Sequence, residues 1–212
     1  LDDNEVVVFG HLVCHVIGSF LALSTYTKAF IASDHLDSPS YRVFTHNDLF
    51  DVVARHGKLD ILICNAGNQH RKPLVEWELR DWHNLMNTHL TSAFVLGQAA
   101  AKHMIPRGSG RIIMIGSIMS TLARPTVHAY AAAKSGIWGL TRTMAAELGP
   151  KGINVNAIAP GFFVTDMNTA LVENPEFKSW IEKRVPLGRW ADPKELGGAA
   201  VFLASKAGSY VN

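Results

Sequence analysis

The sequence has few of the features that mark metal-binding, nucleic-acid-binding and secreted proteins. Its 212 residues include only two cysteines, Cys14 and Cys64, which lack the close spacing of a metal-binding pair. We therefore expect both to be core residues of a protein from a reducing compartment, the cytoplasm. The formal net charge is only +2, and lysine and arginine do not cluster. This balance argues against nucleic acid and favours a small-molecule partner.

A long uninterrupted apolar run is also missing. Residues 6–23 come nearest to one, but acidic residues precede them and His11 and His15 interrupt them. A membrane-spanning helix needs about twenty predominantly apolar residues, so we interpret this segment as a strand followed by a helix and expect no membrane partner. The two histidines are four apart and could share a metal on a helix. Because no third ligand is in view, we predict no metal site.

Strands and helices alternate along the chain. Apolar runs predict buried strands at residues 5–9, 29–33, 59–63, 111–115 and 153–158. Helical patterns cover residues 48–56, 78–104, 128–148 and 196–204, and residues 165–189 predict a mobile helical flap with breaks at Pro175 and Pro186. Such alternation is typical of an α/β protein with a doubly wound, Rossmann-like parallel sheet. We expect a single domain over residues 1–212, with its catalytic part in residues 59–212.

Three polar side chains form the candidate catalytic group. Tyr130 and Lys134 are four apart in the expected helix 128–148, which places both side chains on one face. An ammonium group favours the phenolate form of a tyrosine, so we expect Lys134 to lower the Tyr130 pKa from about 10 toward the working pH. Tyr130 could then act as a general acid or base. Ser117 follows the expected strand at 111–115, where its hydroxyl could hold a substrate oxygen.

With these residues the sequence resembles the short-chain dehydrogenase/reductase family. Ser117, Tyr130 and Lys134 stand at the spacing of the family's catalytic serine, tyrosine and lysine, and Asn87 matches its catalytic asparagine. The resemblance implies cofactor contacts from Tyr130, from Lys134, from the family's Asn-Ala-Gly turn and from its segment over the nicotinamide. The matching residues of the turn and the segment are Asn65, Ala66, Gly67, Pro160, Gly161 and Thr165.

The same resemblance implies a reaction. A secondary alcohol and a nicotinamide cofactor would exchange a hydride reversibly, while Tyr130 exchanges the proton of the substrate hydroxyl. Ser117 would bind the carbonyl oxygen, Lys134 the nicotinamide ribose, and Asn87 a water that links Lys134 to solvent. The resemblance also implies a homo-oligomer, a dimer or a tetramer.

The first part of the chain matches the family less well. After the first strand the family has a turn with three glycines that cradles the cofactor pyrophosphate. Of these only Gly10 is present, with Cys14 and Val16 at the other two positions. Asp34 stands where the family often places a ribose-binding carboxylate, which would repel a 2′-phosphate and favour NAD slightly over NADP. The alternative interpretation of Asp34 is a turn residue.

Two further pieces of the family's fold are not found in the sequence. Only residues 35–44 separate Asp34 from Thr45, where the family carries a helix and a third strand. The chain ends at Asn212, where the family continues into a last strand. We therefore expect the N-terminal part and the last strand to be incomplete in this sequence, and the natural molecule to be longer than the 212 residues.

Four stretches around the expected active site are similar to the gluconate 5-dehydrogenases of that family: residues 68–74, 123–126, 165–171 and 188–190. These enzymes interconvert D-gluconate and 5-keto-D-gluconate. A sugar acid needs a cation for its carboxylate, and a guanidinium group binds a carboxylate through two parallel hydrogen bonds. Arg71 is our first candidate for this cation and Arg124 our second. A solvated loop arginine is the alternative interpretation of Arg71.

Two other functions stay open at this point. One is a reductase of a different carbonyl within the same family, such as a 3-oxoacyl thioester or another polyol. The other is a catalytically silent, dehydrogenase-like protein that binds a ligand or partner, which the altered glycine turn and the missing strand would explain. Against it, a silent protein has no chemical reason to keep four residues together at working spacings, namely Ser117, Asn87, Tyr130 and Lys134.

Overall fold

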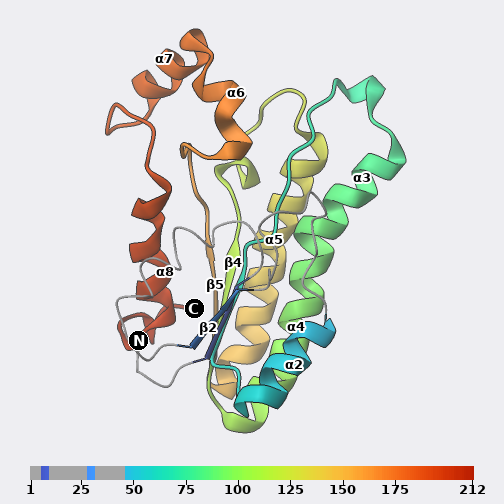
Figure 1. The fold of residues 1–212 in the computed structure, drawn as a ribbon, viewed down its shortest axis with the longest axis vertical. Helices are drawn as coiled ribbons and strands as arrows, with labels where there is room; N and C mark the ends of the chain where they lie inside the picture. The colour runs from blue at the N-terminus through green and yellow to red at the C-terminus, as the bar shows by residue number, and fades with distance from the viewer. Residues whose placement is uncertain (1–5, 10–27, 32–45) are drawn as a thin grey trace.

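The computed structural model describes residues 6–9, 28–31 and 46–212 (Figure 1). The candidate cofactor residues Gly10 and Asp34 lie outside the described residues, as does the whole of the predicted glycine turn. Cys14, the His11 and His15 pair and the short connection at 35–44 are outside them too. Cys64 is a free, buried cysteine, as its sequence context predicts.

One parallel sheet forms the centre of the described fold. Its strands lie in the order β2-β1-β3-β4-β5, and every pairing is parallel. Their bounds are Val6–Phe9 (β1), Lys28–Ile31 (β2), Ile61–Cys64 (β3), Gly110–Ile115 (β4) and Ile153–Ile158 (β5). The order reverses between β1 and β3, and open sheets of this kind bind ligands beyond the carboxyl ends of strands at such a point. The predicted doubly wound parallel sheet is confirmed.

Alternate side chains of the central strands enter two different cores, as the pleat of a buried strand requires. Leu62 and Ile112 pack on one face against α2 (His46–His56), α4 (Ser92–Met104) and α5 (His128–Leu148). Ile61 and Ile113 pack on the other face against α8 (Gly197–Ala204). Figure 1 shows α8 across the sheet from α5. Both faces of the central strands are therefore covered, which explains their continuous apolar runs.

The predicted helix at 78–104 is interrupted by a wide turn. The structure has α3 (Leu79–Met86), a π-helical turn (Asn87–Thr91) and then α4. The cap residues on both sides of the turn keep helical backbone angles, so the helix continues through it. Such single π turns are frequent at functional sites.

The segment after β5 is helical, as the sequence predicts. It contains α6 (Thr169–Val172) and α7 (Pro175–Arg184), which extend beyond the carboxyl ends of the strands (Figure 1). The Asn174 side chain accepts a hydrogen bond from the Phe177 N–H at 2.9 Å and so caps the start of α7. A capping box of Asp192 and Glu195 then begins the turn that leads into α8.

The described residues include neither a membrane-spanning helix nor a cluster of metal-binding side chains. No helix among them is long and apolar enough to cross a bilayer. Likewise, residues 6–9, 28–31 and 46–212 contain no group of three or more histidine, cysteine, aspartate or glutamate residues placed to hold a metal.

Candidate active site

Ser117 is fixed at the carboxyl end of β4. Its backbone is extended, and its Oγ accepts a hydrogen bond from the Met119 N–H at 3.1 Å at the start of a short 3-10 turn. The neighbouring Ile118 N–H donates to the Pro160 carbonyl at 3.1 Å, which ties the end of β4 to the end of β5. The side chain is buried. The sequence therefore places one hydroxyl at the edge of the sheet where ligands are expected.

Lys134 points from α5 toward the same strand end. Its Nζ donates a hydrogen bond to the Ile115 carbonyl oxygen at 2.6 Å and lies 5.8 Å from the centroid of the Tyr130 ring. The side chain is buried, and this burial lowers its pKa to about 8 from an ordinary value of 10.5. The thiol of Cys64, whose own pKa burial raises to about 12, has the weaker opposite effect. An amine with a pKa near 8 can exchange protons close to neutral pH.

The pKa of Tyr130 shifts against our expectation. Burial raises it, while the hydrogen bond with Ser117 and the charge of Arg71 lower it by smaller amounts. The prediction that Lys134 depresses the pKa of Tyr130 is wrong for this structure, because Lys134 directs its Nζ at the Ile115 carbonyl rather than at the phenol. Desolvation of the phenolate outweighs the nearby charges.

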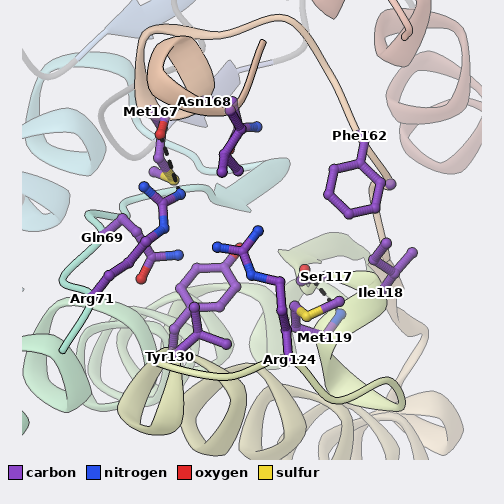
Figure 2. Close-up of a pocket in the computed structure, with 13 residues that line it drawn as sticks. Gln69, Arg71, Ser117, Ile118, Met119, Arg124, Tyr130, Phe162, Met167 and Asn168 are labelled. Carbon is purple, nitrogen blue, oxygen red and sulfur yellow. Dashed lines mark hydrogen bonds between the residues drawn. The ribbon is translucent and has the colours of Figure 1, made fainter. Parts of the chain in front are cut away.

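Two arginines face the hydroxyl groups of Ser117 and Tyr130 across one pocket. Arg71 and Arg124 line a pocket of about 70 Å³ together with Ser117 and Tyr130. Figure 2 shows both guanidinium groups and the Tyr130 ring pointing into the same space. Of the described residues that line this pocket, none is an aspartate or a glutamate. The pocket is therefore a cationic space beside two hydroxyl groups.

The surroundings of the two arginines leave their charge largely uncompensated. Arg71 donates from Nη2 to the Met167 carbonyl at 3.4 Å, and its buried Nε has no hydrogen-bond partner among the residues that the structure describes. Arg124 lies over the Phe177 ring, 5.3 Å from its centroid. Burial lowers the pKa of both groups, and the charge of Arg71 lowers that of Arg124 further. A bound carboxylate would relieve this repulsion.

The described candidate cofactor residues lie at the same edge of the sheet. Asn65, Ala66 and Gly67 follow β3 directly, and Pro160 and Gly161 follow β5, with Thr165 after them. Gly161 lines the pocket. A Cβ at Gly67 would lie only 2.8 Å from Cε1 of His89, so this position has no room for a side chain. Small residues at strand ends leave the backbone accessible to a dinucleotide, and these residues fit one.

Asn87 does not join this group. It begins the π turn, its side chain is exposed, and its Oδ1 accepts a hydrogen bond from Thr91 Oγ1 at 3.2 Å. It is not among the residues that line the pocket. The geometry gives no support to its predicted catalytic role.

His89 is the residue that the sequence interpretation missed. It is buried in the π turn, and its ring meets that of Tyr130 edge-on, with centroids 5.3 Å apart. A signal was available, since Leu85, His89 and Ala93 recur every four residues and all three are buried. This spacing places His89 on the buried face of the helix and Asn87 off it.

The chain is similar in sequence to a known family of reductases and to sugar-acid dehydrogenases. A family model described as enoyl-(acyl carrier protein) reductase matches residues 46–212. Gluconate 5-dehydrogenase from Gluconobacter oxydans is 50% identical over 156 residues, which are 74% of this chain and 61% of that protein. The 2-dehydro-3-deoxy-D-gluconate 5-dehydrogenase of Escherichia coli is 45% identical over 162 residues, 76% of this chain and 64% of that protein.

A solved structure is similar over nearly the same length. The crystal structure of a gluconate 5-dehydrogenase from Burkholderia cenocepacia, in complex with NADP and tartrate, matches with a TM-score of 0.86 and 35% sequence identity. The match covers 100% of this chain and 92% of that one. Against the Gluconobacter enzyme, by contrast, the chain spans 61% of the length.

Proposed function

Because this chain belongs to the short-chain dehydrogenase/reductase family, we propose that it is an NAD(P)-dependent oxidoreductase that interconverts D-gluconate and 5-keto-D-gluconate. The observation that carries the proposal is the pocket in which Arg71 and Arg124 face Ser117 and Tyr130. Hydroxyl groups suited to proton transfer and cations suited to a carboxylate meet there in one space. A hydroxy acid is the kind of substrate that needs both.

Tyr130 carries out the proton transfer. A bound nicotinamide cofactor supplies or accepts the hydride. In the reducing direction the Tyr130 phenol donates its proton to the carbonyl oxygen, and in the oxidising direction its phenolate accepts the proton of the hydroxyl. Ser117 donates a hydrogen bond to the same oxygen and holds it in place. Its place beside Tyr130 in the pocket and its fixed position after β4 suit it to this role.

Arg71 and Arg124 bind the substrate carboxylate at the far side of the pocket. A guanidinium group can hold both carboxylate oxygens, and this sets the distance from the carboxylate to the reacting carbon. Arg71 is placed first because its charge also acts on Tyr130. The place where the two arginines hold the carboxylate therefore decides which carbon of the sugar acid reacts.

The residues after the strand ends hold the cofactor. We assign the described contacts to Tyr130, Lys134, Asn65, Ala66, Gly67, Pro160, Gly161 and Thr165. Gly10 and Asp34 belong to the same proposal, and Asp34 favours NAD slightly over NADP. A homo-oligomer in the cytoplasm, dimeric or tetrameric, completes the proposed assignment.

A second candidate substrate is 2-dehydro-3-deoxy-D-gluconate, which the similarity to the Escherichia coli enzyme favours. It too is a sugar acid and would use the same arginines. A 3-oxoacyl thioester fits less well, because the two half-buried arginines of the pocket would then face no carboxylate at the reacting end. A silent binding protein would not need Tyr130 and Ser117 together in a pocket with two arginines.

The test follows nicotinamide absorbance with D-gluconate, 5-keto-D-gluconate and 2-dehydro-3-deoxy-D-gluconate, each with the matching forms of NAD and NADP. Turnover with gluconate and its 5-keto form is the expected result, and the Tyr130→Phe protein serves as the matched negative control. Preference for the deoxy acid would select the second substrate. No turnover with any pair, from protein shown to be folded, would overturn the proposal.

A further inference from the structure

A buried histidine, His89, contacts the tyrosine of the candidate active site. His89 is only 3% exposed and lies in the π turn between α3 and α4. Its ring meets the Tyr130 ring edge-on, at 5.3 Å between centroids and 85° between planes. This geometry is a favourable one for two aromatic rings and restricts the tilt of the tyrosine. The histidine therefore contacts the residue that carries the proposed proton transfer.

The same imidazole holds the segment that carries Arg71. Its Nε2 lies 2.8 Å from the carbonyl oxygen and 3.1 Å from the backbone nitrogen of Asn68. In one tautomer Nε2 donates to the carbonyl, and in the other it accepts from the N–H. Either way the ring is bonded to the backbone of Asn68, one residue before Gln69 and three before Arg71, both of which line the pocket.

The surroundings of the His89 ring show that it fits closely but leaves one ring nitrogen without a partner among the described residues. Gly67 is the residue that leaves space for the ring, since a Cβ there would lie 2.8 Å from Cε1 and 3.4 Å from Nδ1 of His89. The Nδ1 atom is buried and has no hydrogen-bond partner among the described residues. A buried polar atom without a partner costs free energy. An apolar side chain would fill the same space without that cost, so packing alone does not explain a histidine here.

We propose that His89 is a positioning residue of this active site, which fixes the Tyr130 ring through its ring edge and the 68–71 segment through Nε2. One side chain then sets the distance between the proton-transferring phenol and the carboxylate-binding Arg71. The inference rests on the proposed function for the meaning of that distance. The contacts themselves do not depend on it.

The neutral form of the ring suits this role. Burial, and then the charge of Lys134, lowers the pKa of His89 to about 3, while the backbone bond to Asn68 acts weakly in the other direction. The imidazole therefore stays uncharged at neutral pH. It does not compete with Arg71 for the substrate carboxylate.

Two substitutions separate the two contacts. His89→Phe keeps an aromatic ring against Tyr130 and removes the bond to Asn68. His89→Gln keeps an amide group at about the reach of Nε2 and removes the ring. The control is His83→Gln, because His83 is an exposed histidine on α3 outside the pocket.

The two substitutions should change different kinetic constants. We expect His89→Phe to raise the KM for the sugar acid about tenfold with kcat within about threefold, because Arg71 loses its fixed position. We expect His89→Gln to lower kcat about tenfold with KM within about threefold, because the Tyr130 ring loses its support. Equal changes in both variants, or no change in either, would overturn the proposal.

A second measurement does not depend on turnover. Hydrogen–deuterium exchange of the peptide that covers residues 66–72 should be faster in His89→Phe and close to wild type in His89→Gln and His83→Gln. If the wild type turns over none of the sugar acids while this exchange pattern holds, the proposed function fails and the anchoring of the 68–71 segment stands. Equal exchange in all four proteins would show that His89 does not hold that segment. Peptides far from this segment, such as those of α7, should exchange at the wild-type rate in every variant, which shows that a change at 66–72 is local and not the result of unfolding.

Discussion

Lys134 Nζ donates a hydrogen bond to the Ile115 carbonyl oxygen at 2.6 Å. This bond joins the middle of α5 to the end of β4, next to Ser117, and it is made by a buried ammonium group. The lysine is therefore part of the structural framework as well as of the proposed cofactor site. Burial disfavours the charged form of Lys134 in that position, so the free energy of unfolding should depend on pH.

The contribution of Lys134 to stability should rise with pH. Its folded pKa of about 8 lies below the ordinary 10.5, so the unfolded chain binds more protons between these two values. The protonated lysine thus destabilises the fold below pH 8, and the penalty disappears as pH rises toward 10.5. A shift of this size corresponds to about 3 kcal/mol.

Urea unfolding of wild type and Lys134→Met at several pH values from 7 to 10 checks this. The difference in free energy of unfolding should move in favour of wild type as pH rises. A difference that stays constant over the whole range would contradict the prediction.

Tyr130→Phe should abolish nearly all turnover and leave cofactor affinity almost intact. The substitution removes the hydroxyl that exchanges the substrate proton but keeps the ring, including its contact with His89. Steady-state rates and fluorescence titration with the dinucleotide measure the two effects. A variant that retains a tenth of the wild-type rate would show that Tyr130 is not the acid or base.

Arg71→Ala should raise the KM for gluconate by about 10- to 100-fold, the range for loss of one charge-assisted bidentate contact. Cofactor affinity should be unchanged, because Arg71 is not among the proposed cofactor contacts. Arg142→Ala is the matched control, since Arg142 is exposed on α5. An unchanged KM in Arg71→Ala would refute the carboxylate-binding role.

Gly67→Ala should destabilise the protein by about 1–3 kcal/mol, because the new methyl group would overlap the His89 ring. In a His89→Ala background that ring is gone, and the same change should cost less than about 0.5 kcal/mol. Urea unfolding of the four proteins completes the cycle. Equal costs in both backgrounds would mean that another neighbour limits position 67.

The fold of the catalytic part could largely be predicted from the sequence. Helix α5 has the bounds that were expected, because good helix formers run up to Leu148 and Gly149-Pro150 follow. The strands β4 and β5 were expected within one residue of their bounds. After Arg111 the strand β4 is continuously apolar, as a buried parallel strand is, whereas in β5 Asn154 and Asn156 alternate with the buried Ile153 and Val155. Local composition decides these elements, and no distant contact overrides it.

The site was predicted less completely, for a physical reason. Spacing alone suggested that Ser117, Tyr130 and Lys134 form one group. In the structure Ser117 and Tyr130 line the same pocket, and Lys134 Nζ lies 5.8 Å from the centroid of the Tyr130 ring. Spacing gives no measure of desolvation, so the direction of the Tyr130 pKa was wrong. It also gives no sign of the π turn, in which Asn87 is exposed and His89 is buried.

The π turn has one more consequence, for the length of the chain. A turn of this kind holds one residue more than a regular helix would, so it equals a single-residue insertion. Deleting a residue from Asn87–Thr91 would rotate α3 against α4 by about 100° around their common axis. Since Leu85 of α3 packs on α5 and α4 packs on the sheet, no rotation satisfies both. Homologues that vary in length at this point must therefore repack one of the two helices.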